Sequence, residues 1–409
     1  MKLARHVPGV PLAFAWIVAL SLGLAAPAWT QQVPPPAAPG AGRATEQPRK
    51  KGRDRTLPPL SLSAAWTVTL PDPAASTPAS DTERAYVALR SGRLVALALT
   101  DGSVAWNVPA ADVAGSPVTG DGLVFAALPR LVQAFDARTG EPRWRAEMPA
   151  ALGAPLFWDN GWLLAITSEG EATMFRAATG DVLWKQPVGT PAKAVPAAAN
   201  ERVYVLLDDA RVVALALQTG ATLWESRLPG KPTSIRPLDD RVFVGCTDKF
   251  FYCLDAESGK KKWRWRTGGT VVGTAVVDDA SVYFLSLDSV LRALDRGNGH
   301  QAWKVELPYQ PTAGPFLSAR LLLVPGTGVE LAAFSTLDGK AAGVAKLAGE
   351  AAAAPSLLAP TKVGEGGRVL VVTGDGKAQL LVPSLPVLRS IPLPANYSIT
   401  PAIVIQPEG

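Results

Sequence analysis

Side chains suited to catalysis or metal binding are few in this chain. Its 409 residues include two histidines, His6 and His300, and two cysteines, Cys246 and Cys253. His6 belongs to an N-terminal leader and His300 stands beside a turn, so imidazole-based metal binding and proton transfer are not expected in the mature protein. Three aspartates recur at one phase of a repeat: Asp136, Asp255 and Asp295. Their shared position before a turn predicts hydrogen-bond acceptors for that turn rather than a catalytic carboxylate pair.

A repeat of about forty residues dominates the sequence. Tryptophans mark one phase of it: Trp66, Trp106, Trp144, Trp184, Trp224, Trp263 and Trp303. Turn glycines mark another phase: Gly102, Gly140, Gly180, Gly220, Gly259, Gly299 and Gly339. A degenerate copy has Gly343 in the tryptophan position, and the segment from Ala354 to Val382 supplies an eighth unit.

Each unit has the pattern of four short antiparallel strands, with a tight turn at the glycine. Such units arranged radially predict an all-β fold, an eight-bladed β-propeller of four-stranded blades over residues 61–409. Closure of the ring is left open by the sequence. Either the Trp66 strand or the segment from Val387 to Ile391 could be the outermost strand of the last blade. The segment from Ile399 to Ile405 could complete the innermost strand of the first.

The first sixty residues are predicted to lie outside the propeller. Residues 1–28 combine Lys2 and Arg5 with an apolar run and a small-residue site ending at Ala28, which predicts a cleaved signal peptide. An uncleaved membrane anchor is the alternative. No cysteine follows the apolar run, so lipidation is not expected. Residues 29–60 are rich in proline and then basic, which indicates a disordered linker. We expect a periplasmic or secreted protein without an integral membrane domain after cleavage.

The basic isoelectric point does not indicate nucleic-acid binding. The formal net charge is +5, of which the leader contributes +2 and the linker +4, leaving −1 for residues 61–409. A near-neutral propeller offers no stripe of cations for phosphates. The basic linker is the segment that would make weak contact with an anionic envelope surface, but a plain solubilising tether is the preferred interpretation.

The segments from Ala134 to Trp144 and from Ala293 to Trp303 carry the repeat motif, with Ala-Phe-Asp or Ala-Leu-Asp before the turn and tryptophan after it. This motif resembles that of the pyrroloquinoline-quinone-like propellers, over essentially Trp66 to Val382. Membership implies either a quinone-dependent dehydrogenase or a cofactor-free propeller such as the scaffold subunit of the outer-membrane β-barrel assembly machinery. The fold alone does not decide between them.

The resemblance favours the cofactor-free type. The dehydrogenases of that family have an adjacent Cys-Cys pair, carboxylate and amide ligands for Ca²⁺, a catalytic aspartate and long insertions, whereas repeats here follow one another closely. Cys246 and Cys253 are seven residues apart, on strands expected to share one face of a blade, so a structural disulfide and two buried thiols remain alternatives. We predict no catalytic residue, cofactor or metal site.

One blade carries the residues that we expect to bind a protein partner. Arg236 is the one charged residue among the expected inner-strand segments, and Lys231, Asp239 and Asp240 lie near it in sequence. Arginine is enriched at binding hot spots, although pairing with Asp239 or Asp240 would be a purely structural role. Trp158 falls outside the repeat phase and is expected at the channel mouth. The predicted function is a non-catalytic protein-binding scaffold, with a quinone enzyme or quinone-binding protein and an envelope sensor or wall-binding module as alternatives.

Overall fold

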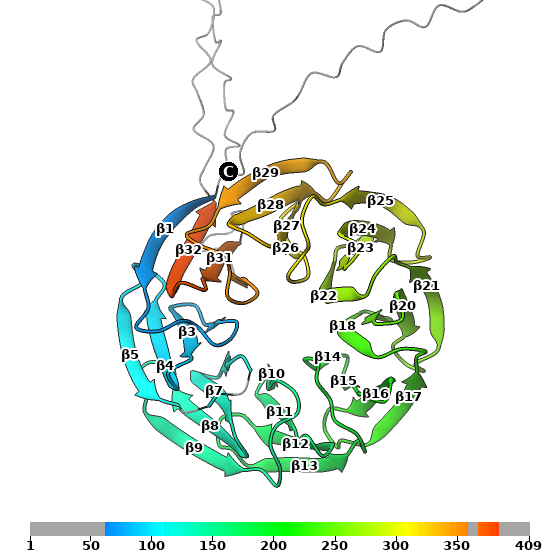
Figure 1. The fold of residues 1–409 in the computed structure, drawn as a ribbon. Helices are drawn as coiled ribbons and strands as arrows, with labels where there is room; N and C mark the ends of the chain where they lie inside the picture. Colours follow the sequence, from blue (N-terminus) through cyan, green and yellow to red (C-terminus); the bar gives the residue numbers. More distant parts are fainter. Residues whose placement is uncertain (1–61, 111, 114, 359–366, 384–409) are drawn as a thin grey trace, which may run out of the picture. The chain divides into compact units, whose positions relative to one another are not determined.

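A computed structural model describes residues 62–110, 112–113, 115–358 and 367–383. Every regular element in these ranges is a β-strand, and the strands form eight four-stranded antiparallel sheets. None of the described residues belongs to a helix long and apolar enough to cross a membrane. The sheets follow one another around a central axis (Figure 1). The predicted eight-bladed β-propeller is therefore confirmed.

Blades 1 to 4 take consecutive strands from inside to outside. Blade 1 has β2(Ala79–Ser80), β3(Arg84–Leu89), β4(Arg93–Ala98) and β5(Val104–Pro109). Blade 2 has β6(Val118–Gly120), β7(Leu123–Leu128), β8(Leu131–Asp136) and β9(Pro142–Glu147). Blade 3 has β10(Phe157–Asp159), β11(Trp162–Ile166), β12(Glu171–Arg176) and β13(Val182–Pro187). Blade 4 has β14(Ala197–Ala199), β15(Arg202–Leu206), β16(Arg211–Ala216) and β17(Thr222–Arg227).

Blades 5 to 7 continue this order, and blade 8 joins the two ends of the described chain. Blade 5 has β18(Pro232–Leu238), β19(Arg241–Cys246), β20(Phe250–Asp255) and β21(Lys261–Arg266). Blade 6 has β22(Val271–Val277), β23(Ser281–Ser286), β24(Val290–Asp295) and β25(Gln301–Glu306). Blade 7 has β26(Phe316–Ser318), β27(Leu321–Pro325), β28(Glu330–Ser335) and β29(Ala341–Lys346). Blade 8 has β30(Ser356–Leu358), β31(Arg368–Val372), β32(Lys377–Pro383) and β1(Leu62–Thr69).

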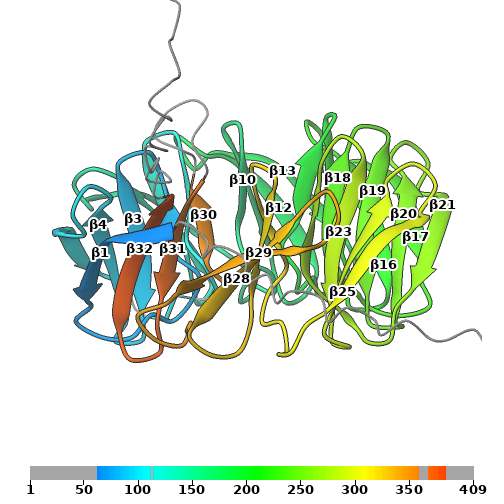
Figure 2. The same ribbon diagram turned by 90° about the horizontal axis from the view of Figure 1, so that it is seen from above.

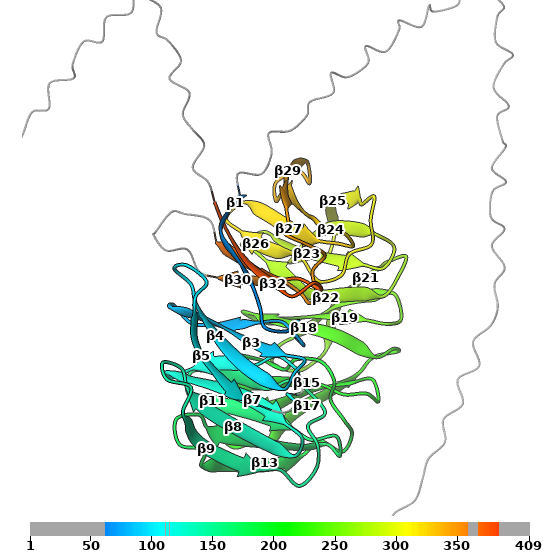
Figure 3. The same ribbon diagram turned by 60° about the vertical axis from the view of Figure 1, so that its left-hand side comes forward.

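Strand β1 closes the ring. It pairs antiparallel with β32 and places Trp66 opposite Leu380 (Figure 3). The Trp66 strand is thus the outermost strand of the last blade, which decides one question that the sequence left open. The segments 387–391 and 399–405 lie outside the described residues. Joining the first strand to the last blade pairs an edge that would otherwise be exposed.

The strands run between two faces of the ring, seen side-on in Figure 2. We call one the turn face, because it carries the turn between the first and second strands of each blade and the turn between the third and fourth. The opposite face, which we call the connection face, carries the turn between the second and third strands and the segments that lead from one blade to the next. Any binding site on the ring is therefore defined by its face and by its blades.

A tryptophan of each of seven outer strands joins its blade to the next one. Its indole Nε1 donates to a backbone carbonyl in the next blade, as from Trp224 to Ala256 at 3.0 Å. Its ring lies against the turn glycine of that blade, and a Cβ on Gly259 would come within 2.5 Å of the Trp224 ring. These glycines also have positive φ, 68° at Gly259, so a larger residue is excluded by both space and backbone conformation.

The seam between blades 7 and 8 lacks this contact for a topological reason. Gly343 of β29 pairs with Ala333, as Trp303 pairs with Ala293 in blade 6, so glycine stands in the tryptophan position. The third and fourth strands of blade 8 are β32 and β1, the two ends of the described chain, and no turn connects them. A tryptophan at position 343 would have no turn glycine to pack against.

The innermost strands differ in length, and a proline accompanies the short ones. They have two or three residues in six blades, where proline stands just before or near the strand, as Pro196 does before β14. Proline has no N–H group to donate to the ladder. Ile235 and Ala275 occupy this position in blades 5 and 6, and β18 and β22 extend to seven residues each. Thr233 Oγ1 also donates to Val271 O at 2.9 Å, which joins these two strands.

The prediction that both cysteines share one face of blade 5 is wrong. Gly245 pairs with Phe251, which leaves a three-residue loop with Lys249 at φ 66° and sets Cys253 opposite Phe243. This register is one residue away from the expected one, and such a shift moves a side chain to the other face. Cys246 packs in the seam with blade 4 and Cys253 in the seam with blade 6, both as free buried thiols.

Replacing Trp224 tests how much one tryptophan contributes to the ring. We expect Trp224→Ala to lower the free energy of unfolding by about 3–5 kcal/mol, because it removes a large side chain that is 8% exposed together with its hydrogen bond. The neighbouring Leu223 is 47% exposed, and Leu223→Ala should change stability by less than about 0.5 kcal/mol. Denaturant unfolding measures the stability of both variants. Equal losses of unfolding free energy would contradict the role of Trp224 in joining the blades.

Candidate functional site

Arg236 lies near the middle of the inner strand β18, opposite Phe243 of β19. Its side chain is exposed, whereas its neighbour Ile235 is buried in the seam with blade 4. Within the described ranges, Arg236 forms no ion pair or side-chain hydrogen bond. The structural alternative, a pair with Asp239 or Asp240, is therefore not formed. An exposed guanidinium offers donors to an external carboxylate or carbonyl.

Asp239 and Asp240 lie at the turn face, where each forms ion pairs with basic side chains other than Arg236. Asp239 Oδ2 is 3.1 Å from Arg296 Nη1 of blade 6. Asp240 Oδ2 is 3.0 Å from Lys262 Nζ, and Oδ1 is 3.5 Å from Arg241 Nε. The hydrogen bond from Lys262 and the nearby charges outweigh desolvation and lower the pKa of the Asp240 carboxyl. The two carboxylates are both about 61% exposed, so they remain accessible to a partner.

Lys231 lies at the opposite end of the inner strand, on the connection face. Its backbone N–H donates to Thr247 Oγ1 at 3.0 Å, and its ammonium is 3.5 Å from Asp208 Oδ1 of blade 4. The seven residues of β18 separate Lys231 from Asp239. The structure therefore brings Arg236 near the turn-face carboxylates along one strand but places Lys231 on the other face. A single compact contact of all four residues is not formed.

Trp158 belongs to the inner strand β10 and lies between blades 2 and 3. Its indole Nε1 donates to Asp121 Oδ2 of blade 2 at 3.3 Å. A Cβ on Gly120 would lie 1.9 Å from the Trp158 ring, so the ring covers the end of β6. Trp158 is half-buried at the turn-face end of its strand. These contacts join two inner strands, which is a packing role at the rim.

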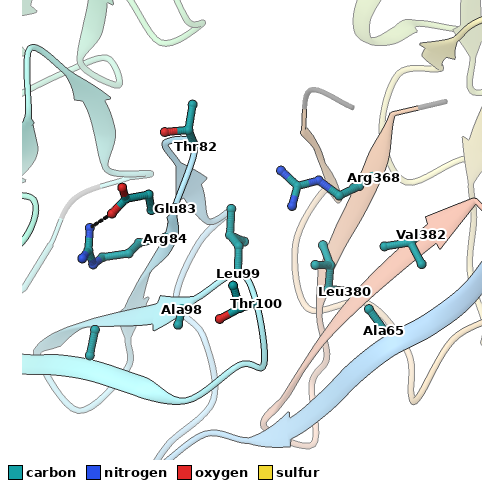
Figure 4. A pocket seen from close by; sticks show the side chains of 11 residues that line it. Ala65, Thr82, Glu83, Arg84, Ala98, Leu99, Thr100, Arg368, Leu380 and Val382 are labelled. Carbon is teal, nitrogen blue, oxygen red and sulfur yellow. Dashed lines mark hydrogen bonds and ion pairs between the residues drawn. The ribbon is translucent and has the colours of Figure 1, made fainter. Parts of the chain in front are cut away.

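A cleft at the closing seam between blades 8 and 1 was not predicted from the sequence. It has a volume of about 580 Å³ on the turn face. Arg368 of β31 faces Thr82 and the Glu83–Arg84 ion pair of blade 1 across it (Figure 4). Residues more than 250 positions apart form its walls, and they meet only because β1 closes the ring. No local sequence signal marks such a site.

The cysteines and the repeated aspartates have structural surroundings in the described ranges. No three His, Cys, Asp or Glu residues there are grouped as ligands for a metal ion. Burial raises the pKa of the Cys246 thiol to about 12 and that of Cys253 to about 11, so both stay protonated. The repeated aspartates cap turns as predicted, since Asp136 Oδ1 accepts from the N–H groups of Arg138 and Thr139. The geometry suits binding of another molecule at exposed rims and seams.

The fold and these rims define a propeller of the pyrroloquinoline-quinone-like repeat class. Comparison with known proteins identifies the family within this class to which the chain belongs. The family described as outer membrane protein assembly factor BamB matches residues 60–128, 130–239 and 208–383. The chain belongs to this family.

Curated relatives agree with that family. The assembly factor BamB of Moranella endobia is 23% identical over 338 residues, which cover 75% of this chain and 84% of that protein. BamB of Burkholderia pseudomallei is 26% identical over 218 residues, covering 49% of this chain and 56% of that protein. The similarity covers most of this chain for the first relative and about half of it for the second.

Solved structures resemble the fold at low identity. BamB from Moraxella catarrhalis aligns with a TM-score of 0.65 at 20% identity, covering 78% of this chain and 99% of that one. A quinohemoprotein alcohol dehydrogenase from Pseudomonas putida HK5 aligns with a TM-score of 0.63 at 14% identity, covering 79% and 76%. At these identities the likeness concerns the propeller fold alone.

Two arginines of neighbouring blades differ in what they contribute to stability. Arg236 is exposed, whereas Arg292 is 8% exposed and donates to Asp288 Oδ2 at 2.6 Å. Desolvation opposes the charge of Asp288, but hydrogen bonds from Arg292 and Ser286 prevail and lower its pKa to about 2. This contribution to stability is present above the ordinary carboxyl pKa and is lost as the pH falls toward 2.

We expect Arg236→Ala to melt within about 1 °C of the wild-type protein at pH 7, since it removes no ion pair or side-chain hydrogen bond within the described chain. Arg292→Ala should melt several degrees lower, because it leaves the Asp288 carboxylate partly buried without its cation. Thermal unfolding followed by circular dichroism compares the two. A large decrease for Arg236→Ala would assign that residue to the scaffold.

Proposed function

We propose that this chain is a non-catalytic scaffold of the cell envelope that binds protein partners during the assembly of outer-membrane proteins. The match to the BamB family between residues 60 and 383 carries the proposal, since assembly is the role that the family description gives. The exposed rims support it physically. Protein interfaces need accessible, well-placed charged and apolar groups, and not a set of convergent catalytic side chains.

The partner-binding residues that we propose are Arg236 with Asp239 and Asp240 on blade 5. Arg236 supplies a planar set of donors without an internal partner, and the exposed carboxylates supply acceptors at the adjoining turn face. Lys231 would contribute to a contact on the connection face, separate from the others. We assign Trp158 to shaping the rim, because its ring already packs on the end of β6.

The N-terminal segments fit an exported scaffold. Residues 1–28 serve in this proposal as the export signal and residues 29–60 as a tether, so the propeller works in the periplasm or outside the cell. Both segments lie outside the described residues. The cations of the tether would add weak attraction to an anionic envelope surface, which falls as salt is raised.

Capture of envelope proteins tests the proposal. Full-length tagged protein is incubated with solubilised envelope from its own host, and bound proteins are identified by mass spectrometry. We expect outer-membrane β-barrel proteins or their assembly components to be enriched, and Arg236→Ala to reduce their yield several-fold without lowering the melting temperature. Arg227→Ala on the outer strand β17 is the matched control. Equal capture by the wild type, Arg236→Ala and Arg227→Ala would refute the assignment of Arg236 as a binding residue. If the wild type enriches no such proteins, the proposed scaffold function is refuted.

The main alternative is a quinone-dependent dehydrogenase or a quinone-binding protein. The fold likeness to the alcohol dehydrogenase is the observation in its favour. Purified protein mixed with pyrroloquinoline quinone and Ca²⁺ separates the two classes. We expect neither oxidation of alcohols or aldose sugars nor tight binding of the quinone, whereas stoichiometric binding at micromolar concentration would support the alternative. Retention on purified cell-wall polymer, without capture of barrel proteins, would instead indicate a wall-binding or sensor module.

A further inference from the structure

Blades 1 and 4 contain nearly the same six-residue motif at their first turn. Residues 81–86 read Asp-Thr-Glu-Arg-Ala-Tyr, and residues 199–204 read Ala-Asn-Glu-Arg-Val-Tyr. Each motif ends on the second strand of its blade, with the tyrosine buried against the outer-strand tryptophan. The motifs share glutamate, arginine and tyrosine. The main chemical difference is an aspartate in blade 1 and an alanine in blade 4.

In blade 1 the aspartate accepts hydrogen bonds from the rest of its motif. Asp81 Oδ1 accepts from the N–H groups of Glu83 and Arg84 at 2.7 and 2.6 Å, and Oδ2 accepts from the Tyr86 hydroxyl at 2.5 Å. Blade 6 repeats this arrangement, with Asp278 Oδ2 accepting from the Tyr283 hydroxyl at 2.7 Å. In both of these blades the tyrosine hydroxyl has a carboxylate partner, and a backbone carbonyl of the next blade lies slightly farther away, at 3.1 Å in blade 1 and 3.3 Å in blade 6.

Blade 4 has the donors without the carboxylate. Tyr204 is fully buried, and neither its hydroxyl nor Arg202 Nε has a hydrogen-bond partner among the described residues. Four other tyrosines in the described ranges donate their hydroxyl: Tyr86, Tyr252, Tyr283 and Tyr309. A buried donor without an acceptor costs about 1–3 kcal/mol, so an external acceptor would be favoured here.

Arg202 is a cation beside Tyr204 that has no acidic partner in the described ranges. The charge of Asp255 also acts on Tyr204, but Asp255 already pairs with Lys262, whose Nζ is 3.0 Å from the carboxylates of both Asp255 and Asp240. Arg202 forms no ion pair within the described ranges, and its Nη1 donates only to the backbone of Asn200 at 3.1 Å. One cation and one buried hydroxyl thus lie on the same strand without an anionic partner.

We propose that the seam of blades 4 and 5 binds a carboxylate from a protein partner, an Asp or Glu side chain that occupies the place held by Asp81 in blade 1. Tyr204 donates its hydroxyl to one oxygen, and Arg202 supplies the counter-charge. Ala199 is half-buried at the turn face, so this place adjoins solvent. Asp239 and Asp240 form the next turn along the ring. This inference rests on the proposed protein-binding function and specifies the partner chemistry.

A pair of capped tripeptides tests the site directly. Acetyl-Gly-Asp-Gly-amide is added to the full-length protein at millimolar concentration, with acetyl-Gly-Asn-Gly-amide at the same ionic strength as the control. Near its dissociation constant, the Asp peptide should raise the melting temperature of the wild type by about 1 °C, and the Asn peptide should not. Tyr204→Phe removes the donor and should abolish the difference between the peptides.

Ala199→Asp supplies the carboxylate from within the chain. We expect this variant to melt above the wild type, to melt above Ala199→Asn, and to lose its response to the Asp peptide. If Tyr204→Phe responds to the Asp peptide as the wild type does, or if neither peptide changes the wild type, the carboxylate site is wrong. If Ala199→Asp fails to fold, the peptide responses of the wild type and Tyr204→Phe decide whether the site exists.

Envelope capture separates failure of this site from failure of the proposed function. If Ala199→Asp and Tyr204→Phe capture barrel-assembly proteins as well as the wild type, and the peptides have no effect, the site fails and the scaffold function stands. If the wild type captures none, the scaffold function fails whatever the peptides show. Loss of capture in both variants, with unchanged folding by circular dichroism, supports the site.

Discussion

The contact between an outer-strand tryptophan and the turn of the next blade determines the rest of this structure. Each ring packs on a glycine that has no room for a Cβ, and each indole N–H donates to a carbonyl of that turn, as Trp184 does to Leu217 at 2.8 Å. The contact holds neighbouring blades at one spacing and one orientation. Because strand β1 brings Trp66 to blade 1, the same contact also closes the ring.

This repeated contact leaves function to the positions where repeats differ. Blades 5 and 6 have longer inner strands than the other blades, and Arg236 is exposed on one of them, β18. Blade 4 replaces an aspartate and so leaves the Tyr204 hydroxyl without an acceptor. Blade 8 joins two ends of the chain and has a cleft at its seam with blade 1. Each departure from the repeat creates a distinct surface on an otherwise regular ring.

The sequence predicts those features that depend on the repeat period, namely the blade number and the aspartate caps. It fails where a single residue changes the register. The loop after Cys246 has three residues instead of two, which moves Cys253 to the opposite face of the blade. Sequence proximity also suggested one site for Lys231 and Asp239, although a strand of seven residues sets them on opposite faces. The closing cleft depends on contacts between distant segments, which no local pattern reveals.

Site-specific photo-crosslinking in living cells tests most directly whether this propeller works by holding a protein partner at its inner rim. A photoreactive phenylalanine analogue is introduced at position 236 on β18 and, as a control, at position 223 on the outer strand β17. The account predicts a defined adduct with a β-barrel membrane protein or an assembly component at position 236 and a much weaker one at position 223. Equal adducts at both positions, or none at position 236 in a folded protein, would contradict it.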